Sequence, residues 1–112
     1  SQGIVLPVGD RKLVFSCGQI AIDPAKGELI DGDPADQVRR VLDNVRAVLQ
    51  AAGSDMDKVV KTTMYLVNLD DFAECNAAYA EYFVESPPAR ATVEVSKLPL
   101  DAAVEIEVVA YA

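Results

Sequence analysis

Two consecutive prolines, Pro87 and Pro88, begin the segment that most restricts how this chain can fold. Proline cannot continue a helix, and the residue before a proline favours an extended backbone. The residues that follow alternate along a strand in two sets, which are Ala91, Val93 and Val95 on one side and Arg90, Thr92 and Glu94 on the other. We therefore predict a strand over residues 87–95 with a polar and an apolar side.

The closing segment, residues 103–111, alternates in the same way, because Glu105 and Glu107 are interleaved with valine and isoleucine. A connection over residues 96–101 has the length of an ordinary loop between two strands. If both strands belong to one sheet, Arg90 and Glu105 can share a face that is not the hydrophobic core. That face is where we expect the chemistry of this protein.

Composition limits the possible functions. The 112 residues correspond to a single domain over 1–112, and 51% of them are apolar, which suggests a second surface buried by self-association. The net charge of −8 disfavours nucleic-acid binding. No apolar run reaches the length of a membrane span and no signal peptide is recognisable, so we expect a cytoplasmic protein that binds neither membrane nor nucleic acid.

The chain contains no histidine, which excludes a serine–histidine or cysteine–histidine nucleophile system and a histidine metal site. The two cysteines, Cys17 and Cys75, lack the spacing of a metal or redox motif, and a disulfide between them cannot be argued from sequence. We expect no metal and no cofactor.

Two helices are predicted. Asp33 and Pro34 form a helix start, and an apolar stripe at helical spacing follows up to Gly53. A second helix runs from Asp70 or Asp71 to about residue 83, where Asn76 interrupts an otherwise apolar stripe. A polar residue in that position needs partners. A hydrogen bond to a nearby loop backbone and a role in ligand binding are about equally consistent with it.

Three further strands are predicted, over residues 4–8, 13–22 and 58–67. Gly18, inside the second of them, marks either a bulge or close approach of another group, or is a plain packing glycine. The strand over 58–67 carries apolar side chains at both parities, which indicates a central strand covered on both faces. With only two helices in the chain, another subunit would have to cover one face.

Arg90 offers a planar fork suited to binding a carboxylate, and Glu105 could hold or activate a water molecule. Thr92 lies on the same side of its strand as Arg90. From the spacing alone, an arginine–glutamate pair across two strands is more often a structural ion pair.

The chain resembles the Rid (YjgF) family of small trimeric proteins, whose active members are imine/enamine deaminases. The segments that carry the resemblance span nearly the whole chain: Cys17-Gly18-Gln19-Ile20, Val41-Leu42-Asp43-Asn44-Val45, Ala51-Ala52-Gly53, Val59-Val60-Lys61-Thr62-Thr63, Asp71-Phe72 with Asn76 and Tyr79, Pro88-Ala89-Arg90, and Val104-Glu105-Ile106-Glu107.

The resemblance implies an α+β fold, in which a mixed sheet is backed by two helices on one face, as in chorismate mutase-like proteins. It also implies a homotrimer around a central barrel, with active sites in the clefts between subunits. In active members the arginine matching Arg90 binds the substrate carboxylate, and the glutamate matching Glu105 orients the hydrolytic water. Backbone groups around Cys17 and Gly18, together with Asn76, help to form the pocket.

The chain departs from the family pattern at three places. Cys17 stands where serine is usual, and Thr92 stands where many members carry cysteine. The family's Tyr-Ser-Gln is represented here by Ser1-Gln2, and we expect the part of the pocket wall that this tyrosine forms to be either missing or not included in these residues.

The resemblance, with Arg90 and Glu105 present, implies hydrolysis of 2-iminobutanoate and 2-iminopropanoate, small-molecule substrates, to 2-oxo acids and ammonia. The alternative is a non-catalytic member of the family that senses a ligand or acts as a chaperone. A ribonuclease ranks third, because the chain is acidic and has no basic patch.

Overall fold

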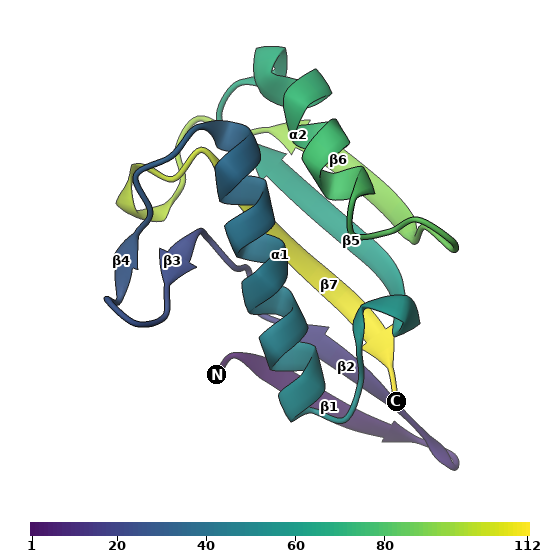
Figure 1. The fold of residues 1–112 in the computed structure, drawn as a ribbon. Coiled ribbons are helices and arrows are strands. Elements are labelled where there is room, and N and C mark those ends of the chain that lie inside the picture. The colour runs from purple at the N-terminus through teal and green to yellow at the C-terminus, as the bar shows by residue number, and fades with distance from the viewer.

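A five-stranded mixed sheet forms the body of the protein, and two helices lie against one of its faces (Figure 1). The structure is a computed structural model that describes all of residues 1–112. In chain order the elements are β1 (Gly3–Val8), β2 (Arg11–Ser16), β3 (Ile22–Asp23), β4 (Glu28–Leu29), α1 (Pro34–Ala51), the 3-10 turn Met56–Lys58, β5 (Val59–Leu66), the 3-10 turn Leu69–Asp71, α2 (Phe72–Ala80), β6 (Ala89–Glu94), the 3-10 turn Pro99–Asp101, and β7 (Val104–Tyr111).

The strand order in the sheet is β1-β2-β7-β5-β6, and β3 and β4 form a separate small hairpin. Only β5 and β6 run parallel, and every other neighbouring pair in the sheet is antiparallel. The two strands predicted over residues 87–95 and 103–111 therefore belong to one sheet, as expected. They are not neighbours, however, because β5 lies between them.

The prediction of an interior strand over residues 58–67 is confirmed by β5, which pairs with β7 on one side and β6 on the other. Thr62, Met64 and Leu66 point toward the helices and are buried. A register shift between Val59 and Lys61 takes Val60 out of this alternation, and its side chain is 46% exposed. Simple alternation along the strand would place Val60 on the same side as Met64. In the structure Val60 lies outside that buried side.

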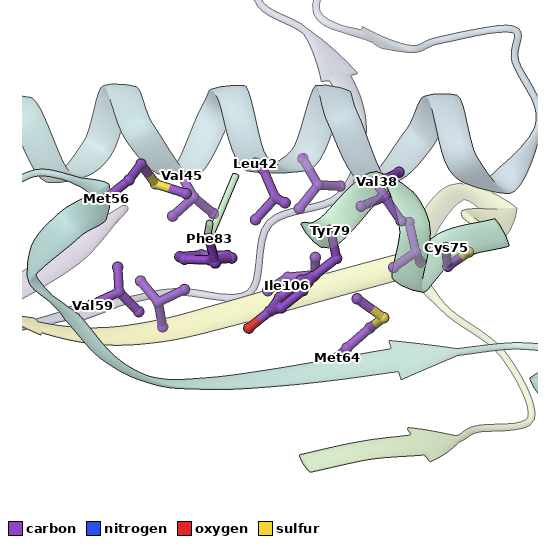
Figure 2. Close-up of a cluster of buried hydrophobic side chains, with 14 of the residues drawn as sticks. Val38, Leu42, Val45, Met56, Val59, Met64, Cys75, Tyr79, Phe83 and Ile106 are labelled. Carbon is purple, nitrogen blue, oxygen red and sulfur yellow. The ribbon is translucent and has the colours of Figure 1, made fainter. Parts of the chain in front are cut away.

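Helix α1 begins as predicted. The Asp33 carboxylate accepts a hydrogen bond from the Asp36 backbone N–H at 2.9 Å, and Pro34 occupies the first turn. Figure 2 shows the stripe of α1 that contributes Val38, Leu42 and Val45 to the core, where they meet side chains of α2 and the sheet. Each fully buried side chain of this size stabilises the fold by about 1.5–3 kcal/mol. None of the helices has the length and apolar character needed to cross a membrane.

Two elements end well before the residue that the sequence predicts, whereas the other boundaries differ by one or two residues. The second helix ends at Ala80, although Phe83 remains buried and its ring packs 4.7 Å from that of Tyr79. The strand predicted over residues 13–22 ends at Ser16, and only an isolated bridge between Gln19 and Ile106 continues the pairing. The chain therefore leaves the regular ladder after Ser16, two residues before Gly18.

Candidate functional site

Arg90 lies on β6 and points toward the helix-covered side of the sheet. Its Nη1 atom donates a hydrogen bond to Asn76 Oδ1 at 2.8 Å. Its guanidinium carbon lies 4.6 Å from the centre of the Tyr79 ring and 5.4 Å from that of Phe72. Asn76 therefore has the partner that its place in an apolar stripe requires, and this partner is the candidate anchoring side chain rather than a loop backbone.

The guanidinium of Arg90 has no carboxylate partner in its own chain. The ion pairs of the protein involve Arg39 with Asp36 and Glu81, and Arg46 with Asp43. A half-buried arginine in a chain of net charge −8 would be expected to find an acidic neighbour. Its free hydrogen-bonding capacity suits an anionic ligand.

A groove of about 400 Å³ opens beside Arg90, lined by Asn76, Tyr79, Ala80, Phe83, Pro87, Pro88 and Arg90. It lies between α2 and the segment that leads into β6. Thr92, two residues further along β6, lies on the same side of the strand as Arg90, and its hydroxyl is buried without a hydrogen-bond partner. Arg90, Asn76 and Thr92 thus form one group.

Glu105 and Gly18 form a second group. Ile106 exchanges backbone hydrogen bonds of 2.9 and 3.0 Å with Gln19, which holds the 17–19 segment across β7. A Cβ atom added to Gly18 would come within 2.7 Å of the Glu105 carboxyl carbon. Gly18 is therefore a position of close approach, because only a residue without a side chain leaves room for the Glu105 carboxylate.

Burial raises the pKa of Glu105, and the nearby charge of Glu107 raises it further. Glu107 itself accepts a hydrogen bond from the Tyr65 hydroxyl at 2.7 Å. Glu105 is thus a carboxylate that holds a proton more readily than an exposed glutamate does. Such a group is a stronger base than an exposed glutamate, which suits it to proton transfer.

Cys17 lies beside this second group and is partly exposed. The Gln19 side-chain amide donates to Cys17 Sγ at 3.0 Å and to Gln2 Oε1 at 2.9 Å. These contacts tie the start of β1 to the loop that carries Gly18. Cys75 is buried in α2, where burial raises the pKa of its thiol to about 11, so it is a packing residue.

The two groups lie on opposite faces of the sheet, and the prediction that Arg90 and Glu105 share a face is wrong. Arg90 is the register partner of Thr62 on β5, whereas Glu105 is the partner of Tyr65. Thr62 and Tyr65 are an odd number of residues apart, so their side chains point to opposite faces. Arg90 faces the helices, and Glu105 faces the open side of the sheet.

Sequence reasoning missed the aromatic residues that hold Arg90. Phe72 and Tyr79 flank Asn76 at helical spacing and belong to the apolar stripe that the sequence predicts, but the stripe alone does not indicate that the two rings contact Arg90. The pairing of Tyr65 with Glu107 and the Gln2–Gln19 contact were also missed, because nothing in the local sequence indicates them. No three histidine, cysteine, aspartate or glutamate side chains are grouped so that they could hold a metal ion.

Comparison with known proteins places the chain in a family. A family model described as Endoribonuclease L-PSP matches residues 3–112. A RutC family protein of Pyrococcus horikoshii is 54% identical over 98 residues, which cover 88% of this chain and 78% of that protein. The 2-iminobutanoate/2-iminopropanoate deaminase of Bos taurus is 43% identical over 101 residues, which cover 90% of this chain and 73% of that enzyme.

Solved structures agree with this result. YyfA of Yersinia pestis, described as a member of the conserved Rid protein family, gives a TM-score of 0.91 at 44% identity and covers 100% of this chain and 86% of its own. TdcF of E. coli with bound serine gives a TM-score of 0.88 at 38% identity and covers 99% and 86%. The match over nearly the whole chain, in sequence and in fold, shows that this protein belongs to the Rid (YjgF) family.

Proposed function

We propose that this protein hydrolyses 2-imino acids, specifically 2-iminobutanoate and 2-iminopropanoate, to 2-oxo acids and ammonia. The observation that carries the proposal is the Arg90 guanidinium, which is oriented by Asn76 and two aromatic rings yet has no carboxylate partner. A planar guanidinium fork matches a substrate carboxylate in a bidentate way. The name of the bovine relative and the serine bound to TdcF support a small substrate that carries a carboxylate.

The reaction needs few groups. Water adds to the imine carbon, and Glu105 accepts a proton from that water and passes it to the imine nitrogen, which forms a carbinolamine. The hydroxyl proton of the carbinolamine then passes to the nitrogen as the carbon–nitrogen bond breaks. The products are ammonia and a 2-oxo acid. The raised pKa of Glu105 makes it a stronger base than an exposed glutamate. Positioning of substrate and water supplies the remainder of the rate enhancement.

We further propose that the working form is a homotrimer in which one subunit contributes Arg90, Asn76 and Thr92, and its neighbour contributes Glu105 with the Cys17–Gly18 backbone. Within one chain the sheet separates Arg90 from Glu105, so a small substrate cannot contact both. The open face also carries apolar side chains that are 37–59% exposed in the single chain: Ile4, Leu6, Phe15 and Val93. Contact between copies through this face would bury them.

The test is a coupled assay. A threonine dehydratase generates 2-iminobutanoate, and the decay of the imine is followed with and without the protein. We expect faster decay that is proportional to protein concentration, and light scattering that gives three times the 12.0 kDa mass of one chain. Decay at the spontaneous rate in the presence of a folded trimer would contradict the enzymatic proposal.

The same assay separates the competing functions. A ligand-sensing member of the family would bind a carboxylate ligand without accelerating imine decay. The family model carries the word endoribonuclease, but the net charge of −8 opposes binding of a phosphate backbone. We therefore expect no cleavage of single-stranded RNA at a protein concentration that is sufficient for complete imine hydrolysis.

A further inference from the structure

One stripe of α2 makes all of the contacts that orient the Arg90 side chain. Phe72, Asn76 and Tyr79 lie at positions i, i+4 and i+7, so they share one face of the helix. Asn76 accepts the hydrogen bond from Nη1, and the two rings lie on either side of it along the helix. The guanidinium therefore rests against an aromatic–amide–aromatic surface.

The Tyr79 ring is itself held firmly. Its hydroxyl is 2.8 Å from Thr62 Oγ1, which is fully buried on β5 beside Arg90 in the register. The ring is 5% exposed and packs at 4.7 Å from Phe83. Figure 2 shows Tyr79 among the core side chains between α2 and the sheet. Its position is set by the core and does not depend on a ligand.

The edge of the guanidinium that remains unoccupied is the one suited to a carboxylate. Nη1 is used by Asn76, whereas Nε and Nη2 have no partner in the chain and neither is sealed from solvent. An arginine side chain has many rotamers, and fixing them on binding opposes affinity. Contacts that fix the rotamer before binding reduce that cost.

We infer that Phe72 and Tyr79 are positioning residues of the carboxylate subsite, which hold Arg90 with its Nε–Nη2 edge ready for the ligand. This inference rests on the proposed function for the identity of the ligand, which is the carboxylate of a 2-imino or 2-oxo acid. Neither ring needs to touch the substrate. Their effect passes through Arg90.

The chain contains a matched control for this arrangement. Arg46 lies 5.3 Å from the Tyr82 ring, but it also pairs with Asp43 at 3.8 Å. Tyr82 donates hydrogen bonds to α1, and its loss removes a comparable ring from the structure. The arginine that it contacts is already paired with an acid of the chain. A substitution at Tyr82 therefore reports the effect of losing a stacked tyrosine away from the subsite.

The test compares Tyr79→Leu, Tyr79→Phe, Phe72→Leu and Tyr82→Leu by KM and kcat for 2-iminobutanoate and by calorimetric Kd for 2-oxobutanoate. We expect Tyr79→Leu and Phe72→Leu to raise KM and Kd by about twofold to thirtyfold, the range of a cation–π contact, with kcat changed less. Tyr79→Phe keeps the ring but loses the hydroxyl contact to Thr62, so we expect it to raise KM and Kd less than Tyr79→Leu does. Tyr82→Leu leaves both constants unchanged. If Tyr79→Leu does not fold, Phe72→Leu at the partly buried start of α2 decides the question.

The same substitutions in an Arg90→Ala background complete the test. If the rings act through Arg90, Tyr79→Leu has no further effect on KM or Kd once the guanidinium is gone. Unchanged KM and Kd in both leucine variants, or an equal loss with and without Arg90, overturns the inference. The proposed function fails separately: Arg90-dependent binding of 2-oxobutanoate without accelerated imine decay rejects the enzyme and leaves the inference standing. Absence of 2-oxobutanoate binding in the unmodified protein rejects the inference as well.

Discussion

At the scale of single residues, the account depends on Arg90, a cation whose surroundings orient it without neutralising it. The chain has 18 acidic residues against 10 basic ones, yet none of the acids lies within ion-pair distance of this guanidinium. Structural arginines in the same protein behave differently, since Arg39 is bound by both Asp36 and Glu81. The contrast is the physical reason to assign Arg90 to a ligand.

Replacing Arg90 by alanine should lower kcat/KM for 2-iminobutanoate by roughly tenfold to a thousandfold, because it removes a bidentate charge contact from a sheltered groove. Lysine should restore only part of this loss, since it supplies charge without the planar fork. Steady-state kinetics on the purified variants measures both. Arg46→Ala, which removes an arginine paired with Asp43, serves as the control. Full activity in Arg90→Ala would mean that the residue only supports the fold.

Glu105→Gln should lower kcat more than it raises KM, because the carboxylate acts on water rather than on substrate anchoring. In the unmodified protein, activity should fall as the pH drops through the raised pKa of Glu105, at a higher pH than an exposed glutamate would give. A pH–rate profile tests this. A profile of the same shape in Glu105→Gln would assign the titration to another group.

The raised pKa of Glu105 also predicts a stability effect. The folded protein holds this proton more tightly than the unfolded chain, so the contribution of Glu105 to stability is fully present below the unfolded pKa and is lost as pH rises through the folded value. Glu105→Gln should therefore raise the melting temperature at pH 7, and the gain should shrink in acid. A lower melting temperature at pH 7 in the glutamine variant would contradict the burial of this charge.

At the scale of elements, Gly18 lies in the irregular segment between β2 and β3, where the backbone passes close to the Glu105 side chain. A methyl group there would displace the Glu105 carboxylate, so Gly18→Ala should reduce kcat by at least about tenfold, as misplacement of a catalytic group does. Gly32→Ala is a suitable control, since its added Cβ would meet the Asp36 Cβ at 3.0 Å, away from the site. Imine hydrolysis and melting temperature are measured for both. An active Gly18→Ala protein would show that Glu105 needs no such space.

Much of this fold was predictable from sequence because local signals and buried patterns agree. The Asp33–Pro34 helix start and the interior position of β5 follow from capping chemistry and from apolar residues at both parities. The site was harder to predict. Alternation within β6 and within β7 gives the two sides of each strand, but β5 lies between them and sets their relative register. That register places Arg90 and Glu105 on opposite faces.

At the scale of the whole molecule, the proposed site draws on both faces of the sheet. One face is covered by α1 and α2 (Figure 1). The other face presents exposed apolar side chains together with Glu105. The helix-covered side holds Arg90, the proposed carboxylate anchor. A site that needs both can form only where the open face of one copy meets the Arg90 groove of another.

The most direct test of this central claim is complementation between two impaired variants. Arg90→Ala and Glu105→Gln proteins are each purified, then mixed, unfolded and refolded together so that subunits exchange. If each site takes Arg90 from one subunit and Glu105 from its neighbour, random assembly at equal amounts restores about a quarter of the sites in a cyclic oligomer. The account predicts imine hydrolysis at about that fraction of the unmodified rate. Activity no higher than the average of the two variants, in mixed trimers confirmed by mass, would contradict it.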